Sequence, residues 1–296
     1  MKKSRTVIFI AVLLLLIPLP VFSDAGPKPS VVIEFSGLTG EKFYVTLLSE
    51  NDSTGPHSAL GKYRNNQRYF EGDKDYEIWL KFLSYEDEDG FYFLQYFQNC
   101  TETQRFEWTY YPPARFKILL YFPEYDSFAV SDEIYERYAF DSYFRVDAGD
   151  PDIKPGSTAK VIRAEKSYNY KWELVSLFAR IIITIAVELV IAFLFGFRTR
   201  KQVLVIASVN IVTQSVLNIL LNIITYRYGS FLFAVNYAMF EIVVFIIEAA
   251  AFSILLNRYS DNGKARPWAA VSYALAANAV SLVFGLLVAY LVPGVF

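Results

Sequence analysis

Long apolar runs fill the C-terminal part of the chain, and short polar loops separate them. At a rise of about 1.5 Å per residue, a helix needs about 20 apolar residues to cross the hydrocarbon of a bilayer. The runs of sufficient length are residues 174–197, 202–224, 231–256 and 268–292. This pattern predicts four transmembrane helices.

The segment before these runs alternates apolar and polar residues over short stretches, as β-strands do. Residues 31–36 and 42–48 flank a Gly-Leu-Thr-Gly turn and predict a hairpin, whereas residues 74–84 have helical spacing. Such strands with Gly and Pro turns favour an antiparallel sandwich with one inserted helix. Further strands are expected near 91–98, 104–110, 115–122, 126–130 and 138–146.

A Gly-, Pro- and Asp-rich stretch, residues 149–157, then predicts a linker. Residues 160–172 are expected to run as a helix into the first span. The predicted fold class is therefore an extracytoplasmic antiparallel β-sandwich-like (α+β) domain, followed by an all-α four-helix transmembrane bundle. Its parts are a signal peptide (1–23), the β-rich domain (24–148), the linker and juxtamembrane helix (149–172) and the four-helix domain (173–296).

The N-terminus has the layout of a secretory signal. Lys2, Lys3 and Arg5 form a positive region, and residues 7–17 form an apolar core that prolines then end. An uncleaved signal anchor is the alternative. Either interpretation exports the segment that follows.

The charges of the loops predict how the spans are oriented. Arg198, Arg200 and Lys201 follow the first span, whereas Arg227 is the one basic residue between the second and third. Basic loops stay on the cytoplasmic side. We therefore expect a multi-pass protein of the bacterial cell membrane, with loops 198–201 and 257–267 cytoplasmic and residues 24–172 and the C-terminus outside.

Composition excludes several classes of function. The chain has 296 residues and a formal net charge of -2, and no basic stripe that would bind nucleic acid. Its one cysteine, Cys100, and one histidine, His57, exclude an intrachain disulfide and the common His-pair metal motifs. The acidic run 86–89 departs from the EF-hand pattern, so a solvated helix end is predicted there. No cofactor and no metal site are predicted.

Polar residues inside the spans are the candidate functional site. A charged side chain at the bilayer centre costs on the order of 3 kcal/mol, so chains rarely keep one without a use. Counting residues inward from the outer end of each span places these polar residues in two layers, and the members of each layer lie at similar depth. Arg180 lies nearer the outer face. The deeper layer contains Glu188, Asn210, Glu248 and Asn278, and the outer layer contains Gln214, Glu241 and Ser281.

Two interpretations of these layers remain open. The polar groups could hold helices together through interhelical hydrogen bonds of about 0.6–2 kcal/mol each. They could instead handle protons or cations, for which the glutamates are better suited than amides. Arg180 lies at a depth close to that of Glu241, so we expect these two side chains to pair across helices.

The chain resembles an uncharacterised family of membrane proteins from low-GC Gram-positive bacteria, with a signal peptide, an extracytoplasmic β-rich domain and four C-terminal transmembrane helices. The segments that carry the resemblance are PSVVIEFSGL, FKILLYFP, DSFAVSDEIYERYAFDSYF, VELVIAFLFGFR and MFEIVVFIIEAAAF. It implies a host with a single membrane and an external domain. It implies no activity.

Three functions are compatible with the sequence. The first is a transport or permease-type component with an external ligand- or partner-binding domain and an intramembrane carboxylate cluster. The second is an intramembrane enzyme that uses two carboxyls as acid and base, although no histidine occurs in the spans. The third is a non-catalytic scaffold or assembly protein. Because four spans are few for an independent transporter, we expect a homo-oligomer or a partner membrane subunit within the lipid bilayer.

Overall fold

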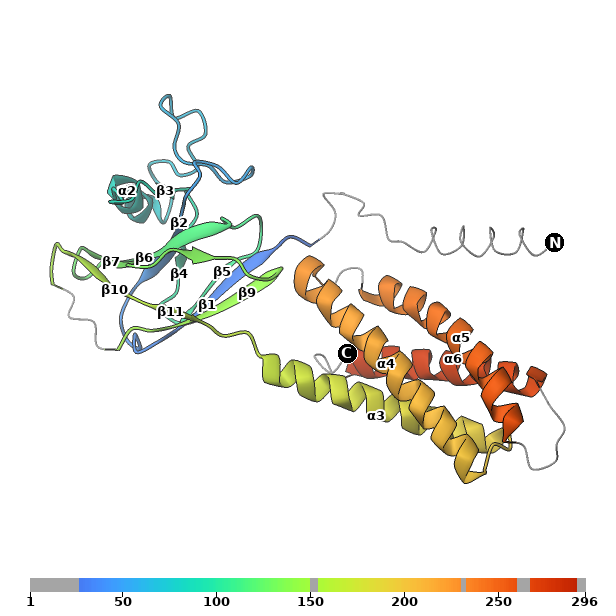
Figure 1. The fold of residues 1–296 in the computed structure, drawn as a ribbon. Coiled ribbons are helices and arrows are strands. Elements are labelled where there is room, and N and C mark those ends of the chain that lie inside the picture. Colours follow the sequence, from blue (N-terminus) through green and yellow to red (C-terminus); the bar gives the residue numbers. More distant parts are fainter. Residues whose placement is uncertain (1–26, 150–153, 230–232, 260–266, 292–296) are drawn as a thin grey trace. The chain divides into compact units, whose positions relative to one another are not determined.

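The described residues form two compact units, which divide between Tyr168 and Asn169. The computed structural model describes residues 27–149, 154–229, 233–259 and 267–291 (Figure 1). The first unit is rich in β-strands and the second consists of four helices, which confirms the predicted order of a β-rich domain and a four-helix unit. The prediction that the sheets are purely antiparallel is wrong, because β1 (Ser30–Ser36) with β9 (Asp141–Asp147) and β7 (Ser127–Ser131) with β10 (Thr158–Ile162) are parallel pairs. The predicted signal peptide, most of the loop 257–267 and the last C-terminal residues lie outside the described residues.

A four-stranded sheet has the order β11-β9-β1-β5. Strand β1 pairs antiparallel with β5 and parallel with β9, which places Val31 opposite Trp108 on one side and Ser142 on the other. Alternation of residues does not determine this parallel pairing. The strands are β1 (Ser30–Ser36), β5 (Arg105–Trp108), β9 (Asp141–Asp147) and β11 (Ala164–Lys166).

A seven-stranded sheet has the order β10-β7-β6-β2-β3, with β4 paired to β2 and β8 paired to β6. Its centre is the antiparallel pair β2–β6, where Val45 faces Leu120, and its edge pair β7–β10 is parallel. Both sheets are therefore mixed. The strands are β2 (Tyr44–Ser49), β3 (Tyr92–Phe93), β4 (Gln98–Asn99), β6 (Arg115–Phe122), β7 (Ser127–Ser131), β8 (Tyr135–Glu136) and β10 (Thr158–Ile162).

Strands β2 and β6 are buried on both faces, which explains their nearly continuous apolar sequences. One face meets the four-stranded sheet across a core that includes Ile33, Leu47 and Ile118. The other face meets helix α2 (Tyr76–Ser84) across an aromatic core around Trp79 and Phe82. The helix predicted over residues 74–84 thus covers the central sheet.

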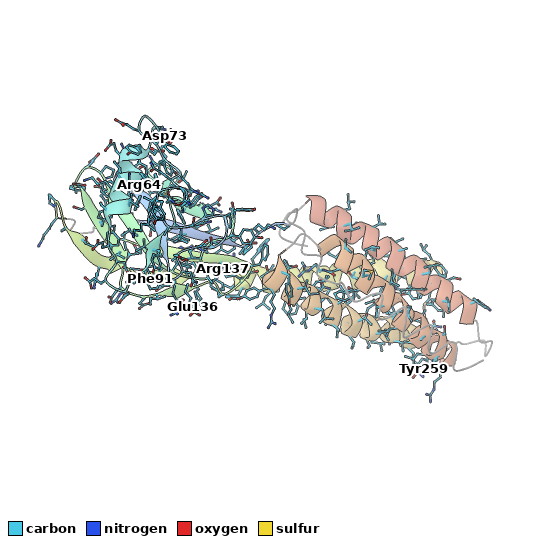
Figure 2. All side chains as sticks on the ribbon, turned by 90° about the horizontal axis from the view of Figure 1, so that it is seen from above. Arg64, Asp73, Phe91, Glu136, Arg137 and Tyr259 are labelled. Atoms are coloured by element: carbon cyan, nitrogen blue, oxygen red, sulfur yellow. The ribbon has the colours of Figure 1, made fainter. Side chains whose placement is uncertain are left out.

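The acidic run after α2 is solvated at Glu86, Glu88 and Asp89, as predicted, but not at Asp87. The side chain of Asp87 is 2% exposed and holds Lys117 Nζ at 3.0 Å through both carboxylate oxygens. Asp89 Oδ2 lies 2.5 Å from the same nitrogen, which also sits 5.4 Å from the ring centroid of Phe91, labelled in Figure 2. A lysine ammonium occupies the centre of this acidic loop because β6 carries Lys117 beneath it.

The expected juxtamembrane helix over residues 160–172 is also wrong. Most of this stretch is extended: β10 continues the seven-stranded sheet, and β11 then pairs with β9 in the other sheet. Ile162 is 1% exposed in the core between the sheets. The chain is extended there because it pairs with an edge strand of each sheet and because Ile162 packs into the core between the sheets. Helix begins only at Tyr170.

The second unit consists of α3 (Tyr170–Leu194), α4 (Arg200–Tyr228), α5 (Phe233–Arg258) and α6 (Pro267–Leu291). All four are long and apolar enough to span a membrane. Thr199 and Gln202 form a capping box that begins α4, and Gly229 ends it with a positive φ of 82°. Among the described residues, α3 and α5 each pack mainly against α4 and α6, so α3 and α5 lie diagonally opposite each other.

Candidate functional site

The helix bundle buries many polar residues beside its apolar core and exposes large apolar residues on its surface. Large apolar residues such as Ile182, Val212 and Ile254 are mostly exposed on its surface. This reversal suits a bundle whose surroundings are hydrocarbon. All eight residues predicted from depth are buried in it, with exposed fractions of 5% or less: Arg180, Glu188, Asn210, Gln214, Glu241, Glu248, Asn278 and Ser281.

Glu248 is held by two neighbouring helices. Thr213 Oγ1 of α4 donates to Glu248 Oε1 at 2.6 Å, and Asn278 Nδ2 of α6 donates to Glu248 Oε2 at 2.7 Å. Both carboxyl oxygens accept a hydrogen bond, so this side chain has the partners that a buried carboxyl requires. Glu248 therefore links α4, α5 and α6.

The other two glutamates lack such partners. Neither carboxyl oxygen of Glu188 or of Glu241 has a hydrogen-bond partner among the described residues. Asn210 lies beside Glu188, and Gln214 lies beside Glu241. The depth comparison placed Glu188 with Asn210 and Glu241 with Gln214, and the structure brings both pairs together.

Arg180 does not form the predicted hydrogen-bonded pair with Glu241. Its Nη2 donates instead to Asn222 Oδ1 of α4 at 2.8 Å. The physical reason is the order of the helices. Arg180 is on α3 and Glu241 is on the diagonally opposite α5, whereas α4 is a direct neighbour of α3.

Two participants were missed from the sequence. Thr213 was not singled out because a threonine in a helix usually bonds a carbonyl of its own helix. Val209 O does lie 3.1 Å from Thr213 Oγ1, but the single hydroxyl proton goes to the closer Glu248 Oε1. Tyr273 is fully buried, and its hydroxyl donates to the backbone oxygen of Glu188 at 3.4 Å. The position of Thr213 three residues after Asn210 was the available signal. We call the set Glu188, Asn210, Thr213, Gln214, Glu241, Glu248, Asn278 and Ser281 the bundle polar core.

The unpartnered atoms of the bundle polar core are almost all oxygens. They comprise both carboxyl oxygens of Glu188 and of Glu241, the amide oxygens of Asn210 and Asn278, the hydroxyl of Ser281, and one nitrogen, Gln214 Nε2. Carboxylate and amide oxygens accept hydrogen bonds, and only the Ser281 hydroxyl and the Gln214 amide could donate. The bundle polar core therefore favours protons, cations or donor-rich groups. No three His, Cys, Asp or Glu side chains in the described ranges are arranged to hold a metal ion.

A groove of about 140 Å³ lies between α5 and α6 on the surface of the bundle. Glu241 and Asn278 are its polar lining residues, and apolar side chains such as Phe245 and Leu275 form its walls. The groove is open at the bundle surface, and Leu275 is 57% exposed there. Glu241 therefore borders both the bundle polar core and its surface.

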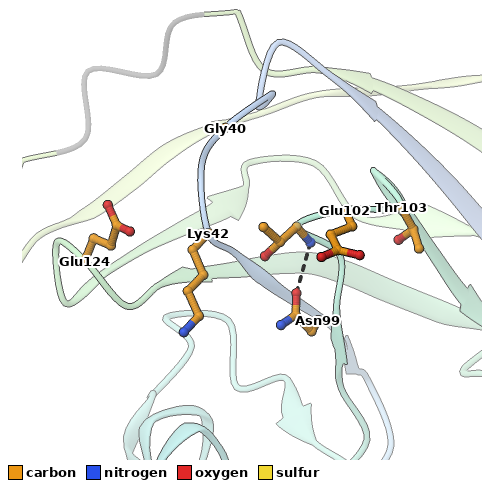
Figure 3. Close-up of a pocket in the computed structure, with 7 residues that line it drawn as sticks. Gly40, Lys42, Asn99, Glu102, Thr103 and Glu124 are labelled. Atoms are coloured by element: carbon orange, nitrogen blue, oxygen red, sulfur yellow. Dashed lines mark hydrogen bonds between the residues drawn. The ribbon is translucent and has the colours of Figure 1, made fainter.

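The β domain contains an open polar pocket of about 550 Å³ (Figure 3). Figure 3 shows Lys42 between Glu124 and Asn99, whose side-chain oxygen accepts from the backbone nitrogen of Thr101 at 3.0 Å. Lys42, Asn99 and Glu124 are exposed to solvent. This pocket lacks the buried unpaired groups that distinguish the bundle polar core.

The single histidine of the chain is a structural residue of the β domain. Arg68 Nη1 approaches His57 Nδ1 at 2.9 Å, and the imidazole ring meets those of Tyr96 and Trp108 edge-on at centroid distances of 5.3 and 4.9 Å. Burial and the Arg68 charge lower the pKa of His57 from 6.5 to about 4. His57 is thus neutral near pH 7 and accepts a hydrogen bond from Arg68.

Comparison of the chain with protein-family models, with curated proteins and with solved structures finds no match. The resemblance to a group of Gram-positive membrane proteins therefore remains a sequence-based prediction. The bundle polar core is the feature of the described structure that best indicates a function.

Proposed function

We propose that this chain is a membrane transport component whose helix bundle binds and passes protons or other monovalent cations. The observation that supports it is that Glu188 and Glu241 are buried and that, among the described residues, neither carboxyl accepts a hydrogen bond, although Asn210 and Gln214 lie beside them. A charged carboxylate in that position would cost several kcal/mol, and a bound proton or cation removes this cost. Glu248, which is already hydrogen-bonded, lies next to both and would connect them.

The proposed orientation places the β domain outside the cell and the start of α4 at the cytoplasmic face. The basic residues support it. Lys201 at the start of α4 lies 5.7 Å from the ring centroid of Tyr259, which follows α5. The basic residues Arg200, Lys201 and Arg258 thus belong to one end of the bundle, as the positive-inside rule requires of a cytoplasmic face. The β domain would then meet an external ligand or partner, and the bundle would associate with a second copy or another membrane subunit.

The test is proton flux into vesicles that contain the full-length chain and a trapped pH-sensitive dye. We expect Glu188→Gln and Glu241→Gln to lower the flux at least tenfold, because glutamine preserves shape but does not ionise. Thr184→Val is the matched control, because Thr184 is buried one turn from Glu188 on α3 and carries no carboxyl.

The proposal is wrong if wild-type vesicles conduct no more protons than empty ones. It is equally wrong if both glutamine variants fold and conduct like the wild type. The latter result would favour the scaffold, in which the bundle polar core only joins helices.

A further inference from the structure

Four basic side chains gather at one end of the helix bundle. Arg198 lies in the link between α3 and α4, Arg200 and Lys201 begin α4, and Arg258 ends α5. Lys201 Nζ lies 5.7 Å from the ring centroid of Tyr259, which brings the start of α4 close to the end of α5. Figure 2 labels Tyr259 at this end of the bundle. All four basic side chains are exposed, and we call them the basic end.

The basic end has no acidic neighbour along the described parts of the chain. Neither Asp nor Glu occurs in residues 193–205, 250–259 or 267–275, the described segments that form this end. The nearest acidic residue on α5 is Glu248, which is fully buried and lies about 15 Å along the helix from Arg258. No carboxylate of these segments therefore neutralises the four positive charges.

Apolar side chains surround these charges. Leu194 at the end of α3 and Trp268 at the start of α6 are 79% and 81% exposed. The ring of Tyr273 packs against Phe197 at a centroid distance of 5.4 Å, which places the start of α6 beside the link between α3 and α4. Basic residues together with an exposed indole are typical of the headgroup level of a membrane. The four helices that end or begin here are apolar enough to span one.

The chemistry of the basic end fits one kind of partner. The partner must supply negative charge for the cations and, directly beside it, apolar surface for Leu194 and Trp268. A soluble phosphate supplies only the charge, and a zwitterionic phospholipid supplies the apolar surface without a net charge. Guanidinium groups donate paired N–H bonds to phosphate oxygens. An anionic phospholipid therefore meets both requirements.

We propose that the basic end binds the headgroups of anionic phospholipids, with Lys201 of α4 and Arg258 of α5 among their ligands. This inference goes beyond the proposed proton pathway, because the basic end contains no residue of the bundle polar core. It also holds for either orientation of the chain in the membrane. A headgroup bound in this way joins the start of α4 to the end of α5.

Trp268 is a built-in reporter of the lipids beside the basic end. Of the four tryptophans, Trp79 and Trp108 are buried in the β domain, and Trp172 lies near the start of α3, at the opposite end of that helix from Leu194. Trp172→Phe therefore leaves Trp268 as the one indole exposed to lipid. Bromine on an acyl chain quenches indole fluorescence only at close contact, so brominated lipids reveal which lipid lies beside Trp268.

The experiment reconstitutes the full-length Trp172→Phe chain into vesicles of phosphatidylglycerol and phosphatidylcholine, with bromine on the acyl chains of one lipid or the other at equal mole fraction. We expect the site beside Trp268 to select phosphatidylglycerol at least fivefold, because each cation near an anionic lipid surface contributes about fivefold in affinity. Lys201→Gln/Arg258→Gln should lower this ratio toward one. Raising the salt concentration from about 0.1 M to about 1 M should lower it without any substitution.

Lys171→Gln/Arg227→Gln is the matched control. It removes the same two kinds of charge at the opposite end of the bundle, where the hydroxyl oxygens of Tyr170 and Tyr226 lie 3.3 Å apart. This variant should keep the ratio measured at Trp268. Equal loss in both double variants would overturn the inference, because the preference would then reflect the overall charge of the chain.

Three other results would also contradict the proposal. Equal quenching by the two brominated lipids would show that the intact basic end selects no headgroup. A ratio that neither salt nor Lys201→Gln/Arg258→Gln changes would show that the preference is not electrostatic. A ratio lost on adding millimolar inorganic phosphate would assign the basic end to a soluble anion.

Discussion

The β domain should lose stability as the pH falls from 7 to 5, and His57 should cause most of the loss. In the folded domain His57 is 7% exposed and accepts a hydrogen bond from Arg68, which a protonated ring could not do. Burial and the Arg68 charge lower its pKa to about 4, against 6.5 in an unfolded chain. The unfolded state therefore binds more protons between these two pH values.

The sign and the size of the effect follow from this difference. Stability is fully present above pH 6.5 and is lost as the pH falls toward 4. Because only the unfolded state binds this proton, the free energy of unfolding should decrease by about 2 kcal/mol between pH 7 and pH 5. Screening of the imidazole ring by solvent reduces the decrease to about 1 kcal/mol. Because the chain has one histidine, no second imidazole contributes in this range.

The assay is urea unfolding of residues 27–168, the unit that contains both β-domain cores. The fluorescence of Trp79 and Trp108, both buried, reports unfolding. His57→Gln is the control, because glutamine can still accept from Arg68 but does not titrate. The variant should be less stable at pH 7, and its stability should change little down to pH 5. A wild-type loss of stability no larger than that of His57→Gln would show that His57 does not cause the pH dependence.

Three further outcomes are expected. Lys117→Met should destabilise residues 27–168 by about 3 kcal/mol or more in the same urea assay, because it leaves the charge of the buried Asp87 carboxylate unpaired. The double variant Lys117→Met/Asp87→Leu should recover most of this loss. A Lys117→Met variant as stable as the wild type would contradict the buried ion pair. Thr213→Val should lower the stability of the full-length chain in detergent by about 1 kcal/mol, because Glu248 Oε1 loses its hydrogen-bond donor. Thermal unfolding followed by circular dichroism measures the change. A melting curve that does not shift would show that this hydrogen bond contributes nothing to stability. Cys100 should react with maleimide only after unfolding, because it is fully buried and burial raises the pKa of its thiol to about 12. Modification of the folded protein at the rate of a free thiol would contradict the burial of Cys100.

The helices and most strands could be predicted because their signals are local. Four long apolar runs have no other stable form in lipid than helices, since every backbone group must be bonded within its own segment. Depth along these helices also predicted neighbours, since the Glu248–Asn278 hydrogen bond joins two residues placed in one layer. The extended form of residues 158–166 could not be predicted this way. It depends on pairing with β7 and β9, which offer free edges of the two sheets. The residues of 158–166 do not themselves reveal these partners.

The amino-acid pattern alone predicts that three carboxyls lie inside an apolar bundle and that a β-rich domain precedes it, because hydrophobicity and periodicity are properties of each segment. Which of these carboxyls forms hydrogen bonds depends on the packing of the helices. The order of helices around the bundle gives the Glu248 carboxyl two hydrogen bonds, whereas the carboxyls of Glu188 and Glu241 form none with the described residues. The same order pairs Arg180 with Asn222 of the neighbouring helix α4. Hydrogen bonds between helices depend on which helices are neighbours, and that is a property of packing that no single segment contains.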